Sequence, residues 1–177
     1  MKLFLPAQTL DHFSQLDLPA LKKQGIRLLF CDIDNTISAL GDTGCSKEAF
    51  RFLEQVKSHG IEPVLFTNNT KAHVERVMSG YPDVELVSFT CKPLPFSFWK
   101  VLARRHLRPS QAIVLGDQLF TDILGGQLAG VPTILCAPLS ENERKDTRFL
   151  RLLENQVYRF WENRGKLRRE DGHVRLL

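Results

Sequence analysis

The segment Ile26–Thr36 has the sequence IRLLFCDIDNT. Its apolar part has the length of a buried strand and ends directly at a carboxylate, Asp32. A short strand that is apolar along its whole length is typical of a parallel sheet covered on both faces. The segment therefore predicts a buried parallel strand that carries Asp32 and Asp34 at its carboxyl end.

Further apolar runs follow this one, and amphipathic segments separate them. The predicted strands are 26–31, 61–66, 84–89, 112–115 and 131–136, and the predicted helices are 46–59, 70–79, 95–106 and 120–129. Strands that alternate with helices form parallel βαβ units. The predicted fold is therefore α/β, with a doubly wound parallel five-stranded sheet. Ligands of such sheets bind beyond the carboxyl ends of the strands.

Polar side chains follow each of the first four predicted strands. They are Asp32 and Asp34, then Thr67, Asn68 and Asn69, then Lys92, and finally Asp117. Carboxylates that gather without an arginine repel one another unless a hard cation such as Mg²⁺ lies among them. A lysine and a Thr-Asn turn opposite them suit a phosphate, and an aspartate can act as a nucleophile toward phosphorus.

Each of these residues also has a purely structural interpretation. The aspartates could cap turns, and the residues from Thr67 to Asn69 could cap the following helix. Lys92 could be a solvated surface lysine, and Lys71 is a rival for its role. The order of the motifs at successive strand ends favours the catalytic interpretation over these alternatives.

The motifs together resemble those of the haloacid dehalogenase (HAD) superfamily of phosphatases. The matching motifs are DIDNT at 32–36, Thr67 in FTNNT, Lys92 in CKP and GDQLFTD at 116–122. The match runs from about Ile26 to Pro138 and implies a Rossmann-like core. The chain as a whole resembles the YqeG type of subfamily IIIA, which is similar to the mitochondrial phosphatidylglycerophosphatases. The resemblance therefore implies phosphatidylglycerophosphate as the substrate.

The same resemblance implies a role for each motif residue. Asp32 would be the nucleophile, and Asp34 would protonate the leaving alcohol and then activate water. Lys92 would neutralise the phosphoryl oxygens and orient Asp32. The implied phosphate-binding residues are Thr67, Asn68 and Lys92, and the implied Mg²⁺ ligands are Asp32, Asp34 through its carbonyl, Asp117, and Asp122 directly or through water.

The spacing of the motifs bears on the size of the substrate. Asp32 and Thr67 are 35 positions apart, and Thr67 and Lys92 are 25 apart. A helix and a strand fill most of each interval, so we expect no cap domain over the site. An open site suits a large or membrane-held substrate, although a neighbouring subunit could form a lid.

Positive charge gathers in the C-terminal segment. Between Arg144 and Arg169 there are nine Lys or Arg residues against three acids, while the whole chain has a net charge of +4. The segment 148–164 has helical periodicity, with an apolar face formed by Phe149, Leu153, Val157, Phe160 and Trp161. We therefore predict a C-terminal amphipathic basic helix within 144–169. Such a helix could lie on anionic lipid, or it could pack its apolar face on the body, which we favour slightly.

Composition limits the class of protein. With 177 residues, the chain has the size of one domain, with a core at 26–138 and a basic tail at 144–169. It has no apolar run near the ~20 residues that span a bilayer, no signal-peptide pattern and no nucleic-acid-binding motif. We expect a cytoplasmic protein, which could also lie on the inner face of the membrane. The alternatives are a phosphatase of a soluble nucleotide or sugar phosphate and a non-catalytic module that recognises phosphate.

Overall fold

The structure is a computed structural model of the 177-residue chain. It describes residues 3–39, 44–77, 83–140, 147–170 and 173–177, and in the last helix it describes side chains from residue 152 onward. The predicted position of the Phe149 side chain and the end of the predicted helix 70–79 therefore lie outside what the structure describes.

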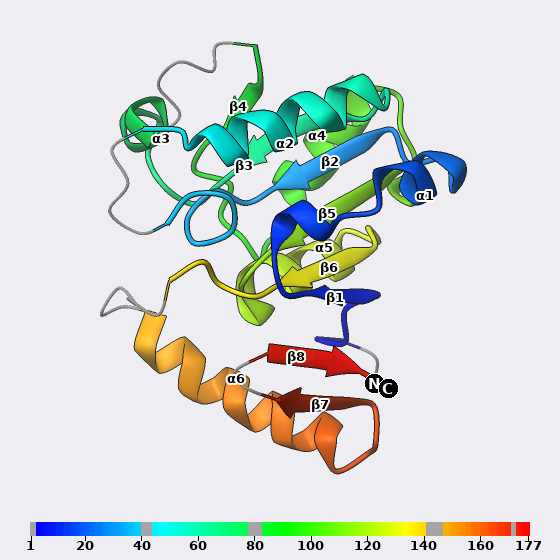
Figure 1. Cartoon of the computed structure of the whole chain (residues 1–177), viewed down its shortest axis with the longest axis vertical. Helices are drawn as coiled ribbons and strands as arrows, with labels where there is room; N and C mark the ends of the chain where they lie inside the picture. Colours follow the sequence, from blue (N-terminus) through cyan, green and yellow to red (C-terminus); the bar gives the residue numbers. More distant parts are fainter. Residues whose placement is uncertain (1–2, 40–43, 78–82, 141–146, 171–172) are drawn as a thin grey trace.

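A six-stranded parallel sheet forms the centre of the molecule (Figure 1). Its strands are β1 (Gln8–Leu10), β2 (Leu28–Cys31), β3 (Glu62–Phe66), β4 (Glu85–Val87), β5 (Ala112–Gly116) and β6 (Thr133–Cys136), in the order β1-β6-β5-β2-β3-β4. The five predicted strands and their parallel pairing are confirmed. The predicted strand count is wrong, because β1 adds a sixth strand at the edge beside β6. With three residues, β1 is too short to show an alternating pattern.

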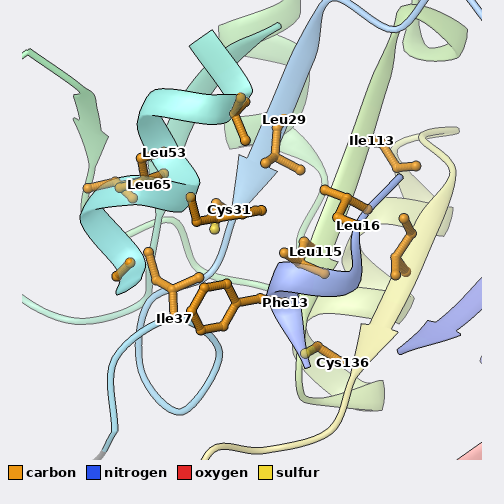
Figure 2. Packing of buried hydrophobic residues seen from close by; sticks show 14 of the residues in the cluster. Phe13, Leu16, Leu29, Cys31, Ile37, Leu53, Leu65, Ile113, Leu115 and Cys136 are labelled. Carbon is orange, nitrogen blue, oxygen red and sulfur yellow. The ribbon is translucent and has the colours of Figure 1, made fainter. Parts of the chain in front are cut away.

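Helices cover both faces of the sheet. They are α1 (Leu18–Lys23), α2 (Lys47–Ser58), α3 (Lys71–Val77), α4 (Phe96–Arg104), α5 (Leu124–Leu128) and α6 (Thr147–Glu162). On one face, Leu53 of α2 and Phe13 pack over Leu29, Cys31 and Leu115 of the central strands (Figure 2). On the other face, Phe98 of α4 packs against Phe30 and Phe66, with ring centroids 5.0 and 4.4 Å away.

The predicted helix 120–129 has a different form in the structure. A π-helical turn at Leu119–Ile123 comes first, and α5 follows at Leu124–Leu128. Gly126 allows α5 to lie close to the sheet, since a Cβ there would be 2.5 Å from Thr133 Cγ2. The wider turn, which places Asp122, depends on these tertiary contacts and has no signature in the apolar periodicity.

The C-terminal segment is helical over a shorter range than predicted. The helical periodicity was predicted as far as Arg164, whereas α6 ends at Glu162, because a turn through Gly165 leads into an antiparallel hairpin of β7 (Leu167–Glu170) and β8 (His173–Leu176). Gly165 has φ +60°, a left-handed conformation that glycine adopts readily and that commonly ends a helix. In the described part of the chain, no helix combines the length and apolarity needed to cross a membrane.

The apolar face of α6 packs on the body. Tyr158 and Trp161 are buried in a cluster with Leu119, Ile123 and Leu135, and Val157 and Phe160 pack partly against it. Leu153, which was predicted on the same face, is exposed. The packing alternative is therefore confirmed for Val157, Phe160 and Trp161. Figure 1 shows α6 and the β7–β8 hairpin beside β1 at the edge of the sheet.

One buried carboxylate ties α6 to the turn that follows β5. Glu154 Oε1 accepts a hydrogen bond of 2.7 Å from the backbone N–H of Leu119, and Glu154 is buried. Leu119 lies between Asp117 and Asp122, so α6 supports the loop that carries both aspartates.

We expect Glu154→Ala to lower the free energy of unfolding by about 1–3 kcal/mol, because the buried N–H of Leu119 loses its acceptor. Urea unfolding measures this change. The matched control is Leu152→Ala on the same helix, whose side chain is 64% exposed, and it should change stability by less than about 0.5 kcal/mol. Equal losses in both variants would contradict this role of Glu154.

Candidate active site

The carboxyl ends of three central strands place the predicted motif residues at one edge of the sheet. Cys31 of β2 is paired with Leu65 of β3 on one side and with Leu115 of β5 on the other. The residues that follow these strands therefore leave the sheet at nearly the same level. The backbone N–H of Asp32 also donates to Leu115 O, at 2.9 Å, which extends the pairing to the start of the first motif.

Lys92 lies at the centre of the predicted site. Its buried ammonium donates to Asp32 Oδ1 and to Asp122 Oδ1, each at 2.6 Å, and to Phe66 O at 3.0 Å. The second oxygen of Asp32 accepts from Thr36 Oγ1 at 3.1 Å. The rival lysine, Lys71, is instead exposed and forms an ion pair with Glu75 at 3.3 Å. The structure therefore brings Lys92, and not Lys71, to the first motif.

The side chain of Asn68 holds the loop that carries Lys92. Its Oδ1 accepts from Lys92 N at 2.7 Å and from Thr90 Oγ1 at 2.9 Å, while its Nδ2 donates to Lys92 O at 3.1 Å. These bonds occupy the carboxamide that was expected to help bind phosphate. Asn68 therefore positions Lys92 through the backbone, and a phosphate contact from Asn68 would have to come from its backbone N–H.

Burial and charge shift the pKa values of the central ion pair. Burial raises the pKa of Asp32 to about 7, although the Lys92 ammonium opposes this shift, and the carboxylate of Asp122 adds to it. Burial alone would lower the pKa of Lys92, but the carboxylates of Asp122 and Asp32 outweigh that effect, so its pKa lies above the ordinary value. Lys92 is thus held as a cation, while Asp32 needs further positive charge to stay ionised at neutral pH.

Three buried carboxylates form a group that fits a divalent cation. Asp32, Asp117 and Asp122 each offer an oxygen, and these oxygens all lie within 4.8 Å of one another. The ammonium of Lys92 contacts two of them, Asp32 and Asp122, and carboxylate oxygens are the ligands that a hard cation such as Mg²⁺ prefers. The donor set therefore fits Mg²⁺. Three of the four predicted metal ligands come together here through their side chains. The fourth, Asp34, was predicted to bind through its backbone carbonyl, which stays a prediction.

Gly116 makes room for one of these carboxylates. A Cβ at this position would lie 2.3 Å from Asp122 Cγ, which is closer than two such atoms can approach. Asp122 Oδ2 also accepts from Gln118 N and Thr121 Oγ1, each at 3.2 Å. The Gly-Asp pair at the end of β5 therefore has a packing reason, because Gly116 lets the π-helical turn bring Asp122 back toward Asp117.

The carboxylate of Asp34 is bound by the segment that follows β3. Its Oδ2 accepts from Asn69 Nδ2 at 2.7 Å and from Thr67 Oγ1 at 3.4 Å, and its Oδ1 lies 2.7 Å from His73 Nε2. Sequence reasoning missed His73, because the five histidines show no ligand spacing. The available signal was its place in the first turn of the helix after the Thr67 motif.

Comparison with known proteins supports the assignment of the motifs. A family model described as HAD-hydrolase-like matches residues 90–146, which include Lys92, Asp117 and Asp122. A Bacillus subtilis protein named "Probable phosphatase YqeG" is 26% identical over 170 residues, which is 96% of this chain and 98% of that protein. A ribulose-1,5-bisphosphate 5-phosphatase of Halopiger xanaduensis is 30% identical over 128 residues, and this chain spans 54% of it.

Solved structures show the same fold. A 4-nitrophenylphosphatase of Thermotoga maritima has a TM-score of 0.55 and 14% identity, with 71% of this chain and 91% of that chain covered. An uncharacterized protein of Listeria monocytogenes serotype 4b has a TM-score of 0.52 and 18% identity, with 67% and 85% covered. The site geometry, the family match and the alignment with YqeG agree with one another. The chain is therefore similar to HAD-like phosphatases, and it aligns with Bacillus subtilis YqeG over nearly its whole length.

Proposed function

We propose that this chain is a Mg²⁺-dependent phosphomonoester hydrolase that forms an aspartyl-phosphate on Asp32. The observation that carries the proposal is the buried group of Asp32, Asp117 and Asp122 with the ammonium of Lys92 between two of them. A purely structural ion pair would need one carboxylate for one ammonium. Here three carboxylates gather at the edge of the sheet where ligands of such folds bind.

In the first proposed step, a carboxylate oxygen of Asp32 attacks phosphorus and the bond from phosphorus to the leaving oxygen breaks. Asp34, in its protonated form, gives its proton to that oxygen, so that the alcohol leaves neutral. Lys92 stabilises the negative charge on the phosphoryl oxygens. The hydroxyl of Thr67, which donates to Asp34 Oδ2 at 3.4 Å, would turn to donate to the same phosphoryl group when substrate binds.

In the second proposed step, Asp34 is a carboxylate and takes a proton from water as the water oxygen attacks phosphorus. The bond from phosphorus to Asp32 breaks, which releases inorganic phosphate and restores the Asp32 carboxylate. Mg²⁺ held by Asp32, Asp117 and Asp122, together with the carbonyl of Asp34, would supply charge neutralisation at the phosphoryl group. Neither step changes an oxidation state, so no redox partner is needed.

For the substrate we propose phosphatidylglycerophosphate, bound at an anionic membrane surface on the cytoplasmic side. Three apolar side chains near Lys92 in sequence support a substrate with acyl chains, since Phe89 is 63% exposed, Phe96 65% and Leu94 50%. Exposed basic side chains of the C-terminal segment, among them Arg159 and Arg164, could approach anionic headgroups. The proposal also rests on the resemblance to YqeG-type proteins.

A soluble sugar phosphate is the second candidate substrate. The observation in its favour is the Halopiger xanaduensis relative, whose name gives ribulose 1,5-bisphosphate as its substrate. The two candidates differ in whether the substrate is presented by a lipid surface. Phosphate release from the two substrate classes therefore separates them.

We expect phosphate release from phosphatidylglycerophosphate in mixed micelles with Mg²⁺, and we expect Asp32→Asn and EDTA each to abolish it. The amide cannot act as the nucleophile, and EDTA removes the metal that the carboxylates need. Turnover of only 4-nitrophenyl phosphate or ribulose 1,5-bisphosphate would support the phosphatase activity and contradict the lipid substrate. No turnover of any of these phosphates would favour a non-catalytic phosphate-binding module.

We expect Lys92→Met to be inactive and, without metal, to lose about 3–5 kcal/mol of stability, because Asp32 and Asp122 stay buried without their cation. Mg²⁺ should then raise the melting temperature of the variant more than that of the wild type, since in the variant only the metal compensates the carboxylate charges that Lys92 otherwise neutralises. Thermal unfolding in EDTA and in MgCl₂ measures both effects. Lys71→Met is the matched control, and an equal Mg²⁺ shift in all three proteins would contradict the expected coupling.

A further inference from the structure

The carboxylate of Asp34 has a partner outside the sequence motifs. Oδ2 contacts Asn69 and Thr67, while Oδ1 contacts His73 Nε2 at 2.7 Å, so the two oxygens are bound from different positions on one segment. A single bonded oxygen would leave the carboxylate free to rotate about its bond to Cβ. Contacts to both oxygens fix its plane.

The helix that carries His73 is itself held in place at two points. The backbone N–H of His73 donates to Thr70 Oγ1 at 3.2 Å, which anchors the residue to the first turn of α3. Val74 and Val77 of the same helix are buried in the core cluster on that face of the sheet. The ring is therefore attached to a packed helix, although its own edge remains partly open to solvent.

The neighbours of the ring determine which nitrogen carries the proton. Arg76 Nη2 lies 3.2 Å from His73 Nδ1, and a guanidinium group can only donate hydrogen bonds. Nδ1 therefore accepts, and in the neutral ring the proton is on Nε2. That proton points at Asp34 Oδ1, so His73 donates to the carboxylate.

We propose that His73 is a positioning residue for Asp34, an inference that rests on the proposed phosphatase function. His73 keeps the Asp34 carboxyl group in the plane from which it passes its proton to the leaving oxygen. It does not itself touch the phosphoryl group or exchange the proton that is transferred. Proton transfer depends steeply on alignment, so a freely rotating Asp34 would be a poorer acid.

A series of leaving groups separates this role from a merely structural one. Phenyl phosphate leaves as a strongly basic phenolate that needs a proton, whereas 2,4-dinitrophenyl phosphate leaves as a weak base that does not. The parameter to compare is kcat/KM, because it reports the steps through formation of the aspartyl-phosphate. The later attack of water is common to both substrates and does not enter it.

In His73→Leu we expect kcat/KM for phenyl phosphate to fall roughly 10–100-fold, part of the ~10²–10⁴-fold that general acid catalysis supplies, and kcat/KM for the dinitrophenyl ester to fall less than about threefold. His73→Gln, whose amide can place an N–H near the position of Nε2, should recover most of the loss. Lys71→Met, on the exposed side of α3, is the matched control and should resemble the wild type on both substrates.

Equal losses on both substrates, or no recovery in His73→Gln, would overturn the role of His73 and leave the phosphatase intact. A wild type that hydrolyses neither substrate would instead reject the proposed function, and the role of His73 with it.

A second measurement does not depend on turnover. Long-range ¹⁵N–¹H spectra of the wild type should show the His73 proton on Nε2, with a slowly exchanging signal that Asp34→Ala removes. A proton on Nδ1, or a signal unchanged in Asp34→Ala, would show that the contact is absent and would overturn the inference.

Discussion

The ammonium of Lys92 lies between the carboxylates of Asp32 and Asp122, and much of the site depends on keeping it there. Two carboxylates at 2.6 Å from one buried nitrogen are stable only if the nitrogen stays charged and both oxygens stay aligned. The carboxamide of Asn68 holds the Lys92 backbone, and the missing side chain of Gly116 admits Asp122. A third carboxylate, Asp117, joins Asp32 and Asp122 in a group of oxygens that fits a divalent cation.

The C-terminal segment contributes to the same constraint from a distance. Glu154 on α6 binds the backbone of Leu119, and Tyr158 and Trp161 bury their rings against the π-helical turn. The turn between Asp117 and Asp122 is therefore supported by a side chain 35 positions beyond Leu119. The positively charged C-terminal segment can thus stabilise the site by packing, whether or not its exposed arginines also bind lipid.

Apolar runs and the polar residues at their ends predicted most of the sheet and the motif residues of the site. Buried parallel strands are apolar along their whole length, so 26–31, 61–66, 112–115 and 131–136 were recognisable one by one. The edge strand β1 and the hairpin of β7 and β8 were not, because an edge strand of three residues and a half-exposed hairpin have no distinctive period. The helical periodicity of α6 was visible, but its end at Glu162 depended on the turn through Gly165.

The sequence by itself determined which side chains leave the carboxyl ends of the strands, because parallel topology sends all of those ends to one edge. Only the tertiary structure decided which of these side chains contact one another. Lys92, and not Lys71, binds Asp32, the Asn68 carboxamide binds the backbone of Lys92, and His73 contacts Asp34. These outcomes depend on distances between residues that are 24 to 60 positions apart. Such distances are set by how helices and loops pack on the sheet, and no local pattern encodes them.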